Sequence, residues 1–157
     1  MFLNAWLPRI LLCGATLPPL LQAGDFGRAQ YVGGTVSAFS GKPVCRIGLS
    51  DDALSVSSGK GAAIAVPYSS IHTVEYGQRV SRRYAEAILV SPMLLLAKKR
   101  RHFLTIGFSD GDARQQAVVF EVGKNSIRAL LAGIEAKTGR RVEFQDEDAR
   151  RAGKGGS

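Results

Sequence analysis

The stretch that decides the fold is His102 to Gly139, HFLTIGFSDGDARQQAVVFEVGKNSIRALLAGIEAKTG. Its first half predicts two strands, at 102–109 and 116–122, because apolar residues recur there with a period of two. The polar run 109–112 between them is typical of a tight turn. The stretch therefore begins with a β-hairpin.

Its second half changes from a strand period to a helix period. An apolar stripe then recurs at helical spacing, and Asn125 or Ser126 is the expected N-terminal cap. Gly139 occupies the position expected of a left-handed residue that ends a helix. The predicted helix is therefore amphipathic. The residues of its stripe are Ile127, Leu130, Leu131 and Ile134.

Upstream of the hairpin, short β segments alternate with turns, as in a meander or a small barrel. Gly33 and Gly34 in the first of them predict a bend or bulge. The chain has 157 residues, 45% of them hydrophobic, which suits one compact domain with tails. Five strands are expected before the hairpin, at 31–39, 44–49, 53–57, 62–66 and 71–77.

Seven strands followed by one amphipathic helix resemble a pleckstrin-homology-like domain of the bacterial or GRAM type. The segment AVPYSSIHTVEYG, 65–77, is also similar to a strand-turn-strand unit of bacterial members. The resemblance implies a mainly β fold with α, in which two near-orthogonal antiparallel sheets form a barrel that the helix closes. The family's phosphoinositide site has several basic residues around the first two strands, where this chain has only Lys42 and Arg46.

An apolar block, AEAILVSPMLLLA at 85–97, lies between the predicted fifth and sixth strands. Ser91 and Pro92 divide the block and suit a helix start, so we expect a helical insertion over 80–99. A helix of 13 residues is only ~20 Å long and cannot cross a hydrocarbon layer of ~30 Å. The block is therefore a candidate surface contact, through Leu89, Met93, Leu94, Leu95 and Leu96.

Basic residues flank this block on both sides: Arg79, Arg82 and Arg83 precede it, and Lys98, Lys99, Arg100 and Arg101 follow it. An apolar segment between positive charges is typical of contact with an anionic membrane surface. The block also suits packing on the protein's own body, a protein partner or a homo-oligomer. Nucleic acid is the alternative partner for the basic run 98–101, given a net charge of +8.

The first 23 residues resemble a secretory signal peptide, because one charge, Arg9, precedes an apolar stretch that ends near Ala23. Cleavage would place the protein in the periplasm or cell envelope, peripheral to a membrane. Without cleavage we expect it in the cytoplasm. The remaining chain divides into a spacer at 24–30, a domain at 31–144, and a mobile charged tail at 145–157 that buries nothing.

Residues that could carry catalysis are few. His72 and His102 are the only histidines, and Cys45 is the only cysteine outside the predicted signal peptide. These three residues show neither a nucleophile motif nor a metal-ligand spacing. Gly59–Gly61 lacks the pattern of a phosphate-binding loop. We therefore predict a non-catalytic binding module with no cofactor, no metal and no small-molecule substrate.

Overall fold

The computed structural model describes residues 24–59, 61–80 and 101–154. All seven predicted strands are present there, and an eighth short strand follows the long helix. In chain order the elements are β1 (Gly24–Gly34), β2 (Val44–Leu49), β3 (Ala53–Ser58), β4 (Ala63–Pro67), the 3-10 turn η1 (Tyr68–Ser70), β5 (Ile71–Gly77), β6 (Phe103–Ser109), β7 (Gln115–Val122), α3 (Lys124–Thr138), β8 (Glu143–Phe144) and α4 (Glu147–Lys154).

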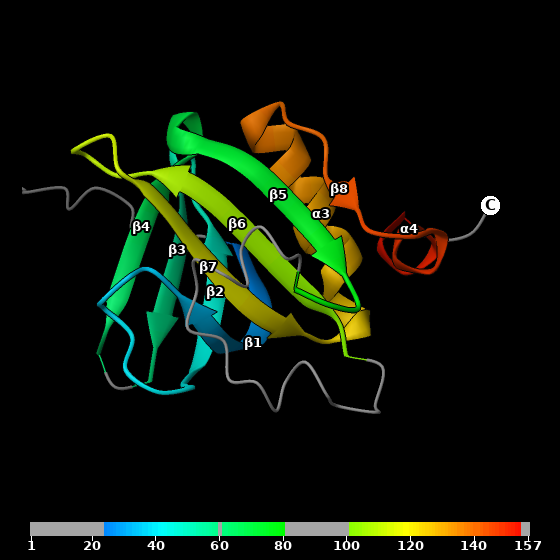
Figure 1. The fold of residues 1–157 in the computed structure, drawn as a ribbon, viewed down its shortest axis with the longest axis horizontal. Helices are drawn as coiled ribbons and strands as arrows, with labels where there is room; N and C mark the ends of the chain where they lie inside the picture. Colours follow the sequence, from blue (N-terminus) through cyan, green and yellow to red (C-terminus); the bar gives the residue numbers. More distant parts are fainter. Residues whose placement is uncertain (1–23, 60, 81–100, 155–157) are drawn as a thin grey trace, which may run out of the picture.

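These strands form one open sheet in the order β4-β3-β2-β1-β7-β6-β5-β8, with β4 and β8 at its two edges. The prediction of two near-orthogonal sheets forming a barrel is therefore wrong, although the fold is mainly β. Figure 1 shows the sheet twisting continuously from β4 to β5. All neighbouring strands are antiparallel except β5 and β8, which are parallel.

The reason for a single sheet is the double pairing of β1. Ala29 pairs with Cys45 of β2 on one side and with Val122 of β7 on the other. Residues 24–30, which we predicted to be a spacer, form the first part of this strand. The predicted bulge is confirmed, since the register with β7 shifts between Tyr31 and Gly33.

Helix α3 covers one face of the sheet instead of closing a barrel, so the predicted closing role is wrong. Its predicted apolar stripe is confirmed as buried and belongs to the main hydrophobic cluster. The helix begins earlier than expected, because its N-cap is Gly123 and not Asn125 or Ser126. It ends as predicted at Gly139, whose φ of 67° is left-handed.

The two faces of the sheet have separate clusters of buried side chains. Leu104 and Phe120 point to the inner face, defined here as the face that α3 covers. Their neighbours along the strands point to the opposite, outer face. A second cluster lies on that outer face and comprises Val32, Val80, Phe103, Ala117 and Val119.

The predicted insertion over 80–99 falls almost wholly on residues 81–100, which lie outside the described residues, as do residues 1–23. The helical insertion is therefore not part of the described fold. Among the described residues, no helix is long and apolar enough to span a membrane.

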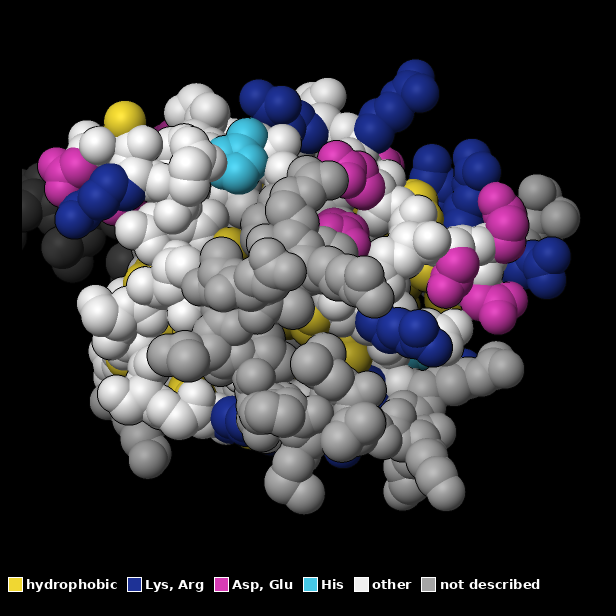
Figure 2. Space-filling view, in the orientation of Figure 1, with side chains coloured by type: hydrophobic (Ala, Val, Ile, Leu, Met, Phe, Trp, Pro, Cys, Tyr) yellow, Lys and Arg dark blue, Asp and Glu magenta, His cyan; other side chains and the backbone are white. Residues whose placement is uncertain are grey.

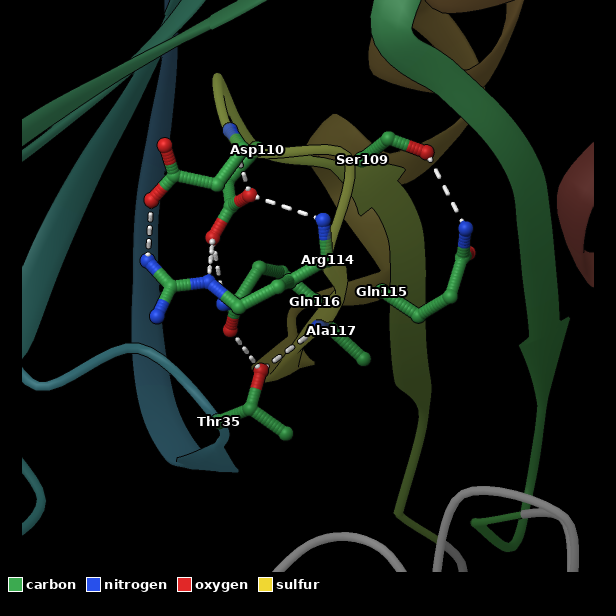
Figure 3. A network of polar contacts seen from close by, with 8 residues as sticks. Thr35, Ser109, Asp110, Arg114, Gln115, Gln116 and Ala117 are labelled. Carbon is green, nitrogen blue, oxygen red and sulfur yellow. Dashed lines mark hydrogen bonds and ion pairs between the residues drawn. The ribbon is translucent and has the colours of Figure 1, made fainter.

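The turn between β6 and β7 is tied together by Asp110 (Figure 3). Its Oδ1 accepts hydrogen bonds from the backbone N–H groups of Asp112 at 3.0 Å and Arg114 at 2.9 Å. Its Oδ2 accepts from Gln116 Nε2, and Gln116 Oε1 accepts from Thr35. The pKa of Asp110 is held below its usual range mainly by the Gln116 hydrogen bond. The turn is thus joined to the chain that leaves β1.

Ala113 in this turn has a φ of 59°, the only positive φ of a non-glycine residue in the described chain. Replacing Ala113 by Gly should therefore stabilise the protein by ~0.5–1 kcal/mol, because glycine adopts this conformation without a Cβ penalty. Urea unfolding measures the difference. The matched control, Ala129→Gly on the exposed side of α3, should lose ~1 kcal/mol. Destabilisation by both changes would contradict the prediction.

Candidate functional site

Three strands and one helix meet at the same end of the sheet. Gly77 at the end of β5 pairs with Phe103 at the start of β6, and Phe103 pairs with Glu121 near the end of β7. Helix α3 then begins at Lys124, directly beyond β7. Figure 1 shows these termini together at the lower right of the fold. Residues that are far apart in sequence are therefore gathered into one surface.

This end of the sheet carries four cations from different elements. Arg79 follows β5, Arg101 precedes β6, and Lys124 and Arg128 lie in the first turns of α3. We call these four residues the basic end. Arg79, Lys124 and Arg128 are exposed, and the side chain of Arg101 is 36% exposed. Figure 2 shows Lys and Arg side chains at this side of the molecule.

Arg101 is oriented by an ion pair with Glu121. Its Nη1 lies 2.8 Å from Glu121 Oε2, and both side chains are partly exposed. Such a pair contributes only ~0–1 kcal/mol to stability. The ion pair mainly positions the chain, because it joins Arg101, just before β6, to Glu121 near the end of β7.

Arg79 is positioned through its backbone by the side chain of Gln145. The Arg79 N–H donates to Gln145 Oε1 at 3.2 Å, and Gln145 Nε2 donates to the Arg79 carbonyl at 2.6 Å and to Glu75 Oε1 at 2.7 Å. The close approach requires glycine at 77, since a Cβ there would lie 2.1 Å from Gln145 Cδ. This amide thus holds the chain as it leaves β5.

Sequence reasoning missed Gln145, because it was assigned to a tail expected to bury nothing. That expectation is wrong for residues 147–154, which form α4 and bury Ala149 completely. Ala149 packs in the main cluster with α3. The only sequence signal for this helix was a carboxylate-rich first turn, Glu147 and Asp148, followed by Arg151 and Lys154 in the last.

The N-terminus of α3 adds to the positive potential of the basic end. Gly123 provides no side-chain cap, and the first turn contains no acidic residue. The first backbone N–H groups of a helix lack intrahelical acceptors and carry a partial positive charge. An anion at this position would face both these N–H groups and the Lys124 side chain.

A shallow hollow of about 540 Å³ lies beside Arg128, between α3 and α4. Phe144 contributes apolar surface, Arg128 and Lys154 contribute positive charge, and Glu135 contributes one negative charge. Arg128 Nε donates to the Ala152 carbonyl at 3.1 Å, and Lys154 Nζ lies 5.6 Å from the centre of the Phe144 ring. The hollow therefore carries two cations and one carboxylate between the basic end and α4.

Tyr76 and His102 form a buried polar pair beneath the basic end. The Tyr76 hydroxyl lies 2.9 Å from His102 Nδ1, and their rings stack at 5.7 Å. Burial, and then the nearby Lys124 charge, lowers the pKa of His102. Burial raises the pKa of Tyr76 to about 12, although Arg128 opposes the increase. Both groups are therefore neutral at pH 7.

The lowered pKa of His102 predicts loss of stability on mild acidification. The unfolded chain, with a histidine pKa near the ordinary 6.5, binds the proton better than the folded one. Stability should be constant above that value and fall as the pH decreases from 6.5 toward 5. Urea unfolding across this range tests it, and His102→Gln should flatten the dependence. An equal slope in both proteins would assign the effect to another group.

The cysteine and the two histidines of the described chain have separate local surroundings. Cys45 is buried, its Sγ contacts the Pro43 carbonyl at 3.7 Å, and burial raises the pKa of its thiol. His72 Nδ1 lies 3.1 Å from Thr73 Oγ1. No group of three His, Cys, Asp or Glu residues in the described ranges could hold a metal ion. No hydrogen bond among the described residues joins the Cys45 thiol to a histidine.

Of the predicted contact residues, the structure describes only Arg79 and Arg101, and it brings them to the same end of the sheet. Lys124 and Arg128 were not predicted, because a sequence does not show that α3 starts beside β5 and β6. The remaining predicted residues lie outside the described ranges: Arg82, Arg83, Leu89, Met93, Leu94, Leu95, Leu96, Lys98, Lys99 and Arg100.

Comparison with known proteins assigns no family to this chain. No protein-family model matches it, and no curated protein matches it. The resemblance to pleckstrin-homology-like domains therefore stays a prediction.

Proposed function

We propose that this protein is a non-catalytic module that binds an anionic membrane surface through its basic end and the basic-flanked segment 79–101. The observation that carries the proposal is the pairing of Gly77 with Phe103. This pairing places both ends of the segment side by side. Arg79, before the apolar block, and Arg101, after it, therefore lie at the same end of the sheet. Lys124 and Arg128 lie at the same end.

Electrostatic attraction supplies the first part of the binding free energy. Each Lys or Arg close to an anionic leaflet contributes ~1 kcal/mol, and the effect decays within about one Debye length, ~8–10 Å in physiological salt. Arg101 contributes less because Glu121 already pairs with it. None of the ion pairs in the described chain involves Arg79, Lys124 or Arg128. Several such residues together give appreciable binding.

The apolar block supplies the second part. Burying a Leu or Met side chain contributes ~1.5–3 kcal/mol, so one or two of them at a lipid boundary would equal the contribution of several cations. The segment 85–97 has only one charged residue, Glu86. The proposal therefore combines attraction by the flanking charges with limited apolar contact. It does not require the chain to cross the membrane.

Export is part of the proposal and rests on the signal-like sequence of residues 1–23, in which one charge, Arg9, precedes an apolar stretch that ends near Ala23. The pleckstrin-homology-like relationship stays within the proposal on the order of seven strands before α3 alone, because the single open sheet differs from the closed barrel that the relationship implies.

Vesicle binding tests the membrane proposal. The double variant Arg79→Gln, Lys124→Gln should bind phosphatidylserine-containing vesicles about 30-fold more weakly, since two charges contribute ~2 kcal/mol. Cosedimentation at low salt measures the partition coefficient. The matched control, Lys42→Gln with Arg140→Gln, removes the same charge from exposed positions outside the basic end and should bind normally. Equal losses in both double variants would show unspecific attraction and contradict the site.

The same variants test the alternative proposal, that the protein binds nucleic acid. A single-stranded oligonucleotide should be bound no more tightly by the wild type than by the Arg79→Gln, Lys124→Gln variant. Leu94→Asp with Leu95→Asp should reduce vesicle binding but leave any oligonucleotide binding unchanged. Oligonucleotide binding without vesicle binding would replace the membrane proposal.

N-terminal sequencing tests export. A mature protein recovered from the producing cell's envelope or medium should begin near Gly24. An intact Met1 on the folded protein would contradict cleavage and place the protein in the cytoplasm.

A further inference from the structure

Strand β4 lies at one edge of the sheet, and among the described strands it pairs only with β3 (Figure 1). The Ser58 N–H donates to the Ala62 carbonyl at 2.7 Å, which fixes the residues that face β3. In an antiparallel ladder, hydrogen-bonded pairs alternate with pairs that make no hydrogen bond. Ile64 therefore also bonds to β3, whereas the N–H and C=O groups of Ala63 and Ala65 point away from the sheet.

This edge lacks the features that usually prevent pairing with another strand. Edge strands are commonly blocked by charged side chains, by bulges or by proline. Strand β4 has no charged residue, its register with β3 is unbroken, and its one proline, Pro67, is its last residue. The Pro67 carbonyl already accepts from the Ser70 hydroxyl at 2.8 Å. Ala63 and Ala65 are exposed, so the accessible part of the edge runs from Ala63 to Ala65.

We infer that the edge of β4 pairs antiparallel with β4 of a second copy of this chain, about a two-fold axis at Ile64. Ala63 of each copy then lies opposite Ala65 of the other, and the two residues exchange N–H to C=O hydrogen bonds. Ile64 lies opposite Ile64 of the second copy, in a pair without hydrogen bonds whose Cα atoms are ~4.5 Å apart. The sheets of the two copies thereby become one continuous sheet.

Hydrogen bonding selects this register over its nearest competitor. An axis at Ala65 would place Ala63 opposite Pro67 of the other copy. Proline has no N–H, so the Ala63 carbonyl would find no donor there. An axis at Ile64 instead gives a partner to every outward N–H and C=O group of Ala63 and Ala65. Backbone groups that leave water in an interface need such partners.

The sequence of the edge favours a second copy over an unrelated strand. The triplet Ala63–Ile64–Ala65 is symmetric about Ile64, as a two-fold contact requires. Copies with a net charge of +8 repel one another, but no Asp, Glu, Lys or Arg occurs from Gly61 to Val74. A partner selected by charge would find nothing to attract it on this strand. Ile64 is half-buried against the main cluster, so pairing would extend the hydrophobic core into the second copy.

Dimerisation through β4 is independent of the membrane proposal. The edge shares no residue with the basic end or with segment 79–101. Either inference can fail while the other holds, because the mass of the particle in solution reports the first and vesicle binding reports the second. The contact is short, so we expect a reversible dimer that dissociates on dilution.

Analytical ultracentrifugation of the full chain over a wide concentration range tests the dimer. The mass of the wild type should rise from that of one chain to that of two. Ala65→Pro should weaken dimerisation at least ~10-fold, because it removes an outward N–H from each copy without touching a hydrogen bond to β3. The matched control, Ala65→Ser, changes the same side chain but keeps the N–H, and should dimerise like the wild type. A wild type that stays monomeric throughout would overturn the inference, as would equal dimerisation of Ala65→Pro.

Cysteine crosslinking tests the register and keeps the inference falsifiable if Ala65→Pro fails to fold. In a background of Cys13→Ser and Cys45→Ala, Ile64→Cys should form a disulfide-linked dimer on mild oxidation. The expected Cα separation of ~4.5 Å lies within the range that a disulfide bridges. The matched control, Ser57→Cys on β3, is exposed but lies one strand away from the edge, and should stay monomeric.

Two crosslinking results would overturn the inference. One is the absence of a disulfide-linked dimer from Ile64→Cys at concentrations where the wild type is dimeric, which would assign dimerisation to another surface. The other is efficient crosslinking of Ala65→Cys and not of Ile64→Cys, which would move the axis to Ala65. A crosslink at Ile64→Cys together with monomeric Ser57→Cys supports the pairing about Ile64.

Discussion

The structure depends on the double pairing of β1. Ala29 and Gln30 pair with β2 on one side and with β7 on the other, so β1 joins the three strands before it in the sheet order to the four that follow. Without this strand the β2–β4 and β5–β7 groups would share no backbone hydrogen bonds in the described chain. The inner cluster, with Tyr31 and Ile134 among its members, packs across this junction and under α3. One continuous sheet is the consequence.

The same pairing pattern creates the basic end. Antiparallel register places the end of β5, the start of β6 and the end of β7 together, and α3 starts where β7 stops. Each element contributes one or two cations that have no sequence relationship to the others. Gln145 then fixes the backbone at Arg79, while Glu121 orients Arg101. The positive surface therefore results from the strand topology. The Tyr76–His102 pair beneath it is neutral at pH 7 and does not change the net charge of this surface.

The sheet uses its two faces differently. The inner face is covered by α3, whose stripe was readable from its period of 3.6 residues. The outer face has a separate, smaller cluster, in which Val119 is fully buried between Val32 and Phe103 of the neighbouring strands.

The sequence by itself determined the seven strands, the bulge near Gly33, the buried stripe of α3 and its end at Gly139, because these follow from local period and backbone preference. Only the tertiary structure decided that the strands form one sheet, that α4 buries Ala149, and that Lys124 and Arg128 lie beside Arg79 and Arg101. Such features depend on strand pairing between distant residues, which local patterns do not encode. The two ends of the basic-flanked segment could be read from the sequence, whereas their adjacency arises from the pairing of Gly77 with Phe103.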